Sequence, residues 1–278
     1  MSPLIEARDL TASFGGRKVV DGVSLTLGEG EMIVVVGPNG AGKTTLTKLL
    51  TGELTPDSGE ILIGGERLSA VPPWQLAARR AVMAQANRLA FPFTVAEVVR
   101  IGIDGVGRAL TRTGREAIIA EALAAADIGH LVARGYQMLS GGEQQRVQFA
   151  RTYAQLRAGR VAAERQVLFL DEPVASLDLA HQIALMDSAQ RLAREGIGVI
   201  AVLHDLNLAA TFADRILVMS AGRCHAFGPP ADVVTRATVR DVFGVDLCRD
   251  AAAGGLPVVL PQHRDAAHRY APVTAAAS

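Results

Sequence analysis

Apolar and polar positions divide the chain into stretches of different period. Residues 5–10 and 18–27 alternate between apolar and polar positions, which is typical of antiparallel strands buried on one face. A helical period is clearest over 182–195. Four short runs are apolar throughout, as strands of a parallel sheet are when both faces are covered, and they are 32–36, 167–170, 199–203 and 216–219. Strands alternating with helices in this way predict an α/β fold with a parallel core sheet.

The middle of the chain has no strand pattern between about residues 87 and 157. Three stretches there have helical spacing instead, and they are 94–101, 113–126 and 142–156. We therefore predict a helical subdomain inserted into the α/β core, which starts with an antiparallel β subdomain. We expect one domain over residues 1–249, followed by an alanine-rich tail over 250–278 to which we assign no function.

Composition and charge narrow the class of protein. Lys plus Arg and Asp plus Glu each number 28 among 278 residues, so the formal net charge is zero. Nucleic-acid-binding proteins normally carry a basic surplus, and we therefore expect no nucleic-acid partner. The apolar runs are far shorter than the roughly 20 residues of a bilayer span, and the first residues lack the pattern of a secretory signal. We expect a cytosolic chain in which Cys224 and Cys248 are reduced.

A glycine-rich loop follows the first apolar run and precedes a helical stretch over 43–51. It fits the phosphate-binding pattern GxxxxGK[ST], with the sequence Gly37-Pro38-Asn39-Gly40-Ala41-Gly42-Lys43-Thr44. Such glycines let backbone N–H groups surround a phosphate, and the helix N-terminus adds partial positive charge. We predict that Lys43 bridges the β- and γ-phosphates and that the Thr44 hydroxyl binds Mg²⁺, with Thr45 also in the nucleotide site. A chance match is the alternative, which the flanking strand and helix disfavour.

An acidic pair stands at the end of the second apolar run. Asp171 and Glu172 directly follow Val167-Leu168-Phe169-Leu170. Ligands of open parallel sheets bind at the carboxyl ends of the strands, so we expect this pair to face the phosphate loop. Asp171 is placed to hold Mg²⁺ through water, and Glu172 to orient and deprotonate the attacking water. Alone, such a pair is more often a helix-capping turn, and the phosphate loop is what favours catalysis.

A third motif narrows the class of nucleotide hydrolase. The stretch Leu139-Ser140-Gly141-Gly142-Glu143-Gln144-Gln145-Arg146 resembles the LSGGQ signature of ATP-binding cassette (ABC) ATPases, with Glu143 where Gln is more usual. Physically it is a second anion site, with a Ser hydroxyl and glycine N–H groups at the start of a helix, and a plain capping box is the alternative. The resemblance to the ABC family covers roughly residues 4–249 and implies a P-loop ATPase core that uses ATP and Mg²⁺.

The family resemblance implies roles for further residues. Phe14 stands where an aromatic side chain stacks on adenine. Gln85 is similar to the Q-loop glutamine that contacts metal and water, Asp178 lies in a D-loop, which crosses between subunits, and His204 matches the switch histidine that contacts the γ-phosphate. Each has an ordinary structural explanation alone, but their order and spacing fit the family. Val174 departs from the usual Thr and removes no nucleotide ligand.

The resemblance also implies how such a chain works. A signature motif cannot easily reach the phosphate loop of its own chain, so relatives form head-to-tail homodimers. Each ATP then lies between one chain's phosphate loop and the other chain's signature residues, Ser140, Gly141, Gly142 and Glu143. ATP binding closes the pair and moves two transmembrane permease subunits. We expect the chain to be held by the permease at the cytoplasmic face of the inner membrane, through the surface around residues 85–94.

Three further features resemble one subfamily of importers. They are the stretch 91–95 after the Q-loop, the stretch 177–182, and a lengthened connection over 158–166. All three are similar to the ATPases of bacterial haem importers, which belong with the ferric-siderophore and vitamin B12 importers. We therefore expect a chain that powers haem import together with a periplasmic haem-binding protein, with a ferric siderophore or vitamin B12 as alternative cargo.

Other classes fit less well. A soluble ABC protein that acts on ribosomes or DNA generally has two cassettes or long coiled coils, often with basic segments, whereas this chain has one cassette, no heptad repeat and no net positive charge. Exporters often fuse their membrane segment to the cassette. We interpret His181 as a residue on a helix surface rather than as an iron ligand.

Overall fold

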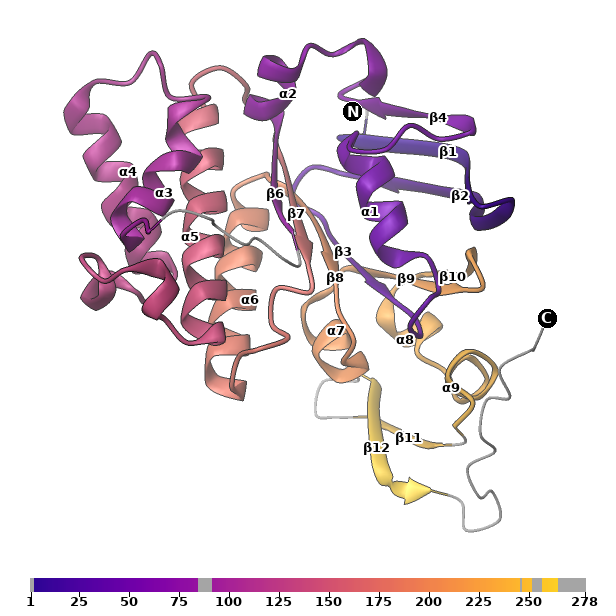
Figure 1. Ribbon diagram of the computed structural model, residues 1–278. Coiled ribbons are helices and arrows are strands. Elements are labelled where there is room, and N and C mark those ends of the chain that lie inside the picture. The colour runs from indigo at the N-terminus through magenta and orange to yellow at the C-terminus, as the bar shows by residue number, and fades with distance from the viewer. Residues whose placement is uncertain (1–2, 85–91, 246, 252–256, 265–278) are drawn as a thin grey trace.

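A six-stranded sheet forms the centre of the fold (Figure 1). The computed structural model describes residues 3–84, 92–245, 247–251 and 257–264. All strands of this sheet run parallel except β10 at one edge, and their spatial order is β10 (Arg223–Gly228), β9 (Arg215–Ser220), β3 (Met32–Val36), β8 (Gly198–Val202), β7 (Val167–Asp171) and β6 (Arg80–Met83). The four apolar runs of the sequence lie in β3, β7, β8 and β9, and their central residues are buried. The predicted parallel core sheet is confirmed.

A second, antiparallel sheet lies on the other side of helix α1 (Lys43–Thr51) from the core sheet. Its spatial order is β2 (Arg17–Leu27), β1 (Ile5–Phe14), β4 (Ser58–Ile63) and β5 (Glu66–Arg67). Ile5 pairs with Leu27 on one side and with Ile63 on the other, and this register turns the apolar side chains inward. Three leucines of α1 belong to one apolar cluster with residues of both sheets, so this helix joins the antiparallel subdomain to the core.

Three helices pack together beside the core sheet, on the left of Figure 1, and they are α3 (Val95–Asp104), α4 (Arg112–Ala125) and α5 (Gly141–Gly159). Thr94 begins α3 with a capping box, in which its hydroxyl accepts the Glu97 N–H and the Glu97 carboxylate accepts the Thr94 N–H. The apolar faces of these helices share a cluster with the sheet, which confirms the predicted inserted helical subdomain.

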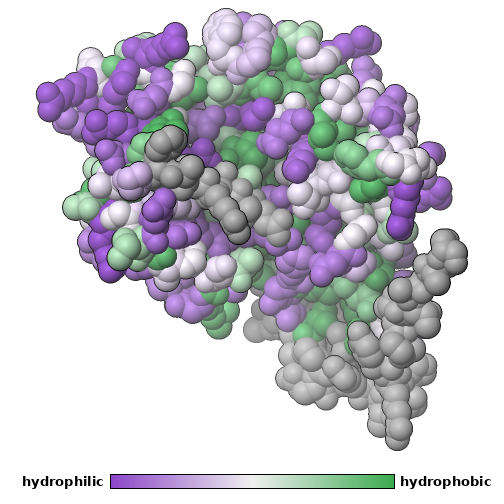
Figure 2. Space-filling view, viewed as in Figure 1, coloured by the Kyte–Doolittle hydropathy of each residue, from purple (hydrophilic) through white to green (hydrophobic). Residues whose placement is uncertain are grey.

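Shorter elements and a long helix connect these parts. They are η1 (Leu68–Ala70), α2 (Pro73–Arg79), η2 (Gly129–Leu131), η3 (Tyr136–Met138), α6 (Leu179–Arg194), α7 (Leu206–Phe212), α8 (Pro230–Val233) and α9 (Arg236–Phe243). None of the helices in the described ranges is both long and apolar enough to cross a bilayer. Hydrophilic and hydrophobic side chains are interspersed on the face drawn in Figure 2.

A small hairpin, β11 (Leu247–Ala251) and β12 (Pro257–Arg264), follows α9. The boundary that we expected at residue 249 falls within β11, and the sequence pattern did not predict β12. The side chain of Asn207 on α7 holds β12 by two hydrogen bonds. Its Oδ1 accepts the Val259 N–H at 2.7 Å, and its Nδ2 donates to the Val259 carbonyl at 3.1 Å. The side-chain amide of Asn207 thus bonds the backbone of Val259 in the way that a neighbouring strand would.

The contact between α3 and α5 depends on Gly102. A Cβ at this position would lie 2.2 Å from the Arg151 carbonyl oxygen. We expect Gly102→Ala to lower the free energy of unfolding by about 1–3 kcal/mol, because overpacking forces the helices apart. Gly105→Ala, directly after the same helix, is the matched control because nothing lies within 4 Å of its added Cβ. Urea denaturation measures both variants, and equal stability would contradict a close contact at Gly102.

Candidate functional site

The loop between β3 and α1 surrounds a cavity of about 210 Å³. Backbone geometry requires glycine at two of its positions. Gly42 has φ +96°, and a Cβ there would lie 2.4 Å from the Val19 carbonyl oxygen; at Gly37 a Cβ would lie 2.2 Å from that of Met219. The residues that line the cavity are Val19, Asn39, Gly40, Ala41, Gly42, Lys43, Thr44, Thr45 and Glu172. The loop therefore has the shape and the N–H groups of a phosphate cradle at the start of a helix.

Lys43 lies across this cradle and is only 6% exposed. Its ammonium donates to the Gly37 carbonyl at 2.8 Å and to the Pro38 carbonyl at 3.1 Å. Burial lowers the pKa of Lys43, while the nearby charges of Glu172 and Asp171 act to raise it. The charged ammonium can exchange these carbonyl oxygens for phosphate oxygens without leaving the loop.

Asp171 ends β7 and is 5% exposed. Its Oδ1 is buried and has no hydrogen-bond partner among the described residues. Burial and the charge of Glu172 raise the pKa of Asp171 to about 6, against the effect of Lys48 and Lys43. Because an unpaired buried carboxylate oxygen is costly and Mg²⁺ prefers oxygen ligands, this side chain fits a ligand of a divalent cation.

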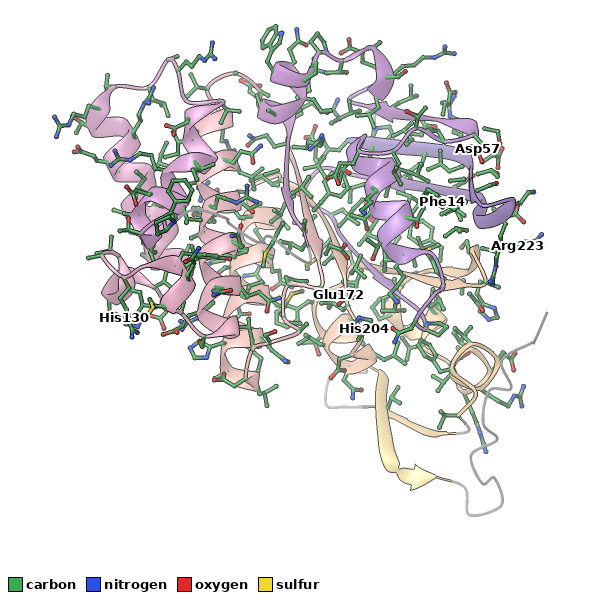
Figure 3. All side chains as sticks on the ribbon, in the orientation of Figure 1. Phe14, Asp57, His130, Glu172, His204 and Arg223 are labelled. Carbon is green, nitrogen blue, oxygen red and sulfur yellow. The ribbon has the colours of Figure 1, made fainter. Side chains whose placement is uncertain are left out.

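Glu172 directly follows β7 and has a left-handed backbone, with φ +52°. Its N–H donates to the carbonyl of Val202 at the end of the neighbouring strand β8, at 3.2 Å. This strand pairing also brings His204 close, and its Nε2 lies 2.6 Å from the Glu172 carboxylate (Figure 3). The Glu172 side chain is 14% exposed and lines the cavity of the phosphate loop. A carboxylate held by an imidazole at this place can accept a proton from water.

The signature residues form a second cluster at the start of α5. Ser140 caps the helix: its Oγ accepts the Glu143 N–H at 3.3 Å, and the Glu143 carboxylate accepts the Ser140 N–H at 2.7 Å. The motif is therefore a capping box, the alternative that the sequence had left open. It also borders a cavity of about 350 Å³, whose lining residues are Ser140, Gly141, Gly142, Glu143, Arg146, Ser176, Leu177, Asp178 and His181. The motif is thus both a cap and a wall of an open cavity.

Asp178 begins α6 as its N-cap residue. Its carboxylate accepts the His181 N–H at 3.0 Å and lies 2.8 Å from the His181 Nδ1. Gly142 of α5 lies against this segment, since a Cβ there would lie 2.9 Å from the Ser176 carbonyl oxygen. The signature and the D-loop segment are therefore packed together within one chain.

The structure thus gathers the predicted residues into two groups. The phosphate loop lies with Asp171, Glu172 and His204, and the signature lies with Asp178. Phe14 is 52% exposed at the end of β1 and does not line the phosphate-loop cavity. Gln85 lies outside the described residues.

Two glutamines without a role in the sequence analysis hold the segment between the two groups. Gln145 on α5 donates to the Glu172 carbonyl, and Gln182 on α6 donates to the carbonyls of Val174 and Leu177. Gln145 stands within the signature stretch, but its contacts depend on tertiary packing and had no local signal.

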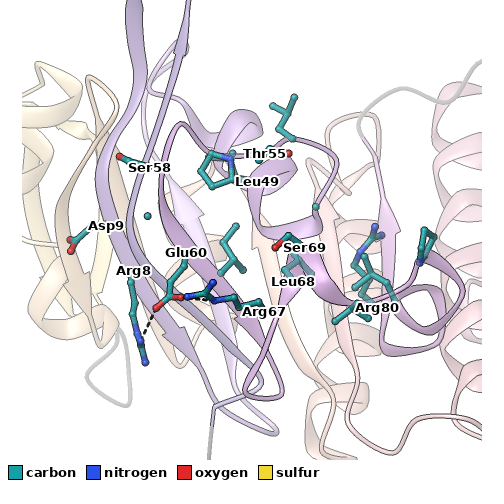
Figure 4. A pocket seen from close by; sticks show the side chains of 18 of the residues that line it. Arg8, Asp9, Leu49, Thr55, Ser58, Glu60, Arg67, Leu68, Ser69 and Arg80 are labelled. Carbon is teal, nitrogen blue, oxygen red and sulfur yellow. Dashed lines mark hydrogen bonds and ion pairs between the residues drawn. The ribbon is translucent and has the colours of Figure 1, made fainter.

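A larger cavity of about 1180 Å³ lies elsewhere, between β4, α1 and α2 (Figure 4). The Glu60 carboxylate at its rim is paired with Arg8 at 2.8 Å and with Arg67 at 3.4 Å. Glu60 is thus occupied by ion pairs, and none of the glycine-loop residues, Asp171 or Glu172 lines this cavity. The larger cavity is therefore not the candidate catalytic site.

A phosphate loop on a parallel sheet, with an acidic pair at the end of a neighbouring strand, defines the class of P-loop nucleotide hydrolases. Comparisons with known proteins give the family. The ABC transporter family matches residues 20–175. The Hemin import ATP-binding protein HmuV of Rhizobium meliloti (strain 1021) is 46% identical over 260 residues, which cover 93% of this chain and 98% of that protein.

Two solved structures are also similar. A bacterial ABC transporter cassette solved as a dimer has a TM-score of 0.71 and 25% identity, covering 81% of this chain and 98% of that one. A metal-chelate type ABC transporter in an inward-facing conformation has a TM-score of 0.76 at 22% identity, covering 94% and 99%, and shows the fold alone. The chain belongs to the ABC transporter family and is one of its ATPases.

Proposed function

We propose that this chain is the ATP-hydrolysing subunit of a bacterial haem importer. The observation that carries the proposal is the 46% identity to a hemin import ATP-binding protein across 98% of its length. The family match itself ends at residue 175, whereas this likeness covers 93% of the chain. The similarity to this import protein therefore continues past the end of the family match and includes the segments of Asp178 and His204.

ATP binds at the phosphate loop in this proposal. The backbone N–H groups of residues 37–45 surround the phosphates, and the Lys43 ammonium exchanges its carbonyl partners for phosphate oxygens. The exposed ring of Phe14 is available to stack on the adenine. Mg²⁺ would be held by the Thr44 hydroxyl and Asp171, with Gln85 as a further ligand, and when bound it draws charge from the phosphate oxygens.

Hydrolysis uses Glu172 as the general base. Its carboxylate accepts a proton from the attacking water, and His204 at 2.6 Å orients this carboxylate and reaches toward the γ-phosphate. The left-handed backbone at Glu172 and its N–H bond to Val202 fix the direction in which the side chain leaves the strand.

The chain works as a homodimer in this proposal. The phosphate-loop cavity and the signature cavity share no lining residue within one chain, which fits an arrangement in which the signature at Ser140 meets the phosphate loop of a second chain. The similar cassette that was solved as a dimer supports this arrangement. Two permease subunits would hold the pair at the cytoplasmic face of the inner membrane, and a periplasmic haem-binding protein would deliver the cargo.

Deletion of the gene tests the cargo. We expect the bacterium to lose growth on haem as the sole iron source and to keep growth on a ferric siderophore. The wild-type chain should restore growth and Lys43→Ala should not, because haem import needs ATP. Loss of growth on the siderophore alone would overturn haem as the cargo and would leave the ATPase assignment in place.

A further inference from the structure

The segment that carries the general base is held from the signature helix by one side chain, that of Gln145. Its Nε2 donates to the Glu172 carbonyl at 2.7 Å, and its Oε1 accepts the Ser176 N–H at 3.1 Å. The NH₂ group and the oxygen of the Gln145 amide therefore both form hydrogen bonds, one to each end of the turn over residues 172–176. The bond within the turn from the Ala175 N–H to the Glu172 carbonyl is long, at 3.4 Å, and Gln182 of α6 holds the middle of the turn at the Val174 carbonyl, at 3.3 Å.

Gln145 also lies on the same rigid element as the signature. It stands about one helical turn after Ser140, Gly141 and Gly142, which begin α5. Its side chain is part-buried, and Gly142 lies against the Ser176 carbonyl, so α5 contacts the turn at two points. A displacement of the signature along or around the α5 axis therefore moves the amide that holds the Glu172 carbonyl.

Glu172 is sensitive to such a displacement. Its φ of +52° is uncommon for a residue with a side chain, and neighbouring contacts have to maintain it at a cost of about 1–3 kcal/mol. The Val202 carbonyl holds the N–H of Glu172, and Gln145 holds its C=O. Loss of the Gln145 contact leaves the Glu172 carbonyl with the long bond from the Ala175 N–H at 3.4 Å, so the carboxylate is held less firmly in its direction toward His204.

We propose that Gln145 is a positioning residue that ties the signature helix to the general base, and thereby couples the two ATP sites of the homodimer. The inference rests on the dimer of the proposed function. There, the signature of one chain contacts the ATP on its partner's phosphate loop, while Gln145 of that chain holds the Glu172 of its own site. ATP in one site thus sets the base in the other.

The variant Gln145→Met tests this role, because it keeps the length and volume of the side chain and removes both hydrogen bonds. We expect kcat for ATP hydrolysis by the full-length chain, assembled with its permease, to fall by about 10- to 100-fold, as for a base misplaced by about 1 Å. The KM for ATP should stay within about twofold of wild type. The Hill coefficient for ATP should fall toward one, since each site then acts without the other.

Gln155→Met is the matched control on the same helix. The Gln155 amide donates to the carbonyls of Ala77 at 2.9 Å and Arg80 at 3.1 Å, away from Glu172. It should lose a similar amount of thermal stability and keep its kcat. Equal losses of kcat in both variants, or a raised KM with unchanged kcat in Gln145→Met, would overturn the positioning role.

The coupling between the two ATP sites and the identity of the cargo are tested separately from the positioning role. A lower kcat with an unchanged Hill coefficient would overturn the coupling between the sites. Haem uptake by the wild-type complex tests the proposed cargo separately, so a complex that hydrolyses ATP but imports another substrate leaves the Gln145 comparison unaffected.

Discussion

Glu172→Gln is expected to bind ATP with near wild-type affinity and to hydrolyse it at least about 100-fold more slowly. The amide has the same shape as the carboxylate and keeps its place beside His204, but it cannot accept a proton from water. The nucleotide contacts of the phosphate loop are unchanged, so the loss should fall on kcat. Titration calorimetry measures the affinity, and steady-state phosphate release measures the rate.

The control for this variant is Glu164→Gln, which removes a carboxylate from an exposed residue in the connection between α5 and β7. Its rate should equal that of wild type. Near-normal turnover of Glu172→Gln would show that Glu172 is not the general base and that another group accepts the proton from water.

Lys43→Ala is expected to weaken ATP binding by at least about 10- to 100-fold, which corresponds to the loss of one or two charge-assisted hydrogen bonds. Lys43 carries the positive charge among the residues that line the phosphate cradle, and its ammonium donates to two loop carbonyls. Its removal should therefore leave the fold intact, which circular dichroism checks.

Lys18→Ala is the comparison for Lys43→Ala, since it removes the same charge from an exposed ion pair with Asp21 at 2.7 Å. Such surface pairs contribute little, and ATP affinity should be unchanged. An unchanged affinity in Lys43→Ala, measured by titration calorimetry, would contradict the assignment of the phosphate site.

The core strands could be predicted from the sequence because burial on both faces leaves an uninterrupted apolar run. Strand β6 could not, since it has four residues and begins with the charged Arg80. It is a strand because it pairs with β7, from Arg80 opposite Val167 to Met83 opposite Leu170. Strand β12 depends in the same way on Asn207, which lies 52 residues before Val259 in the chain.

In the candidate site, too, the local motifs could be predicted from the sequence, whereas the contacts between distant elements could not. The phosphate loop and the acidic pair are local motifs whose chemistry can be derived from residue types and spacing. The contact between Glu172 and His204 requires the pairing of β7 with β8, and the sequence indicated it only through a family resemblance. The bonds of Gln145 span 27 and 31 residues between two elements, and no local pattern carries such a contact.

Before any nucleotide arrives, the start of α5 already holds an anion of its own. The bonds from the N–H and the hydroxyl of Ser140 lower the pKa of Glu143, so this carboxylate is charged at neutral pH. Its charge offsets the partial positive charge of the helix N-terminus, which would otherwise attract inorganic phosphate or sulfate. Arg134 lies 3.8 Å from this carboxylate and Arg146 lines the same cavity, so charges of both signs border the signature. In the proposed dimer, a phosphate presented on the phosphate loop of a second chain would bring further contacts with it, so we expect the signature to bind phosphate better in that setting than from solution.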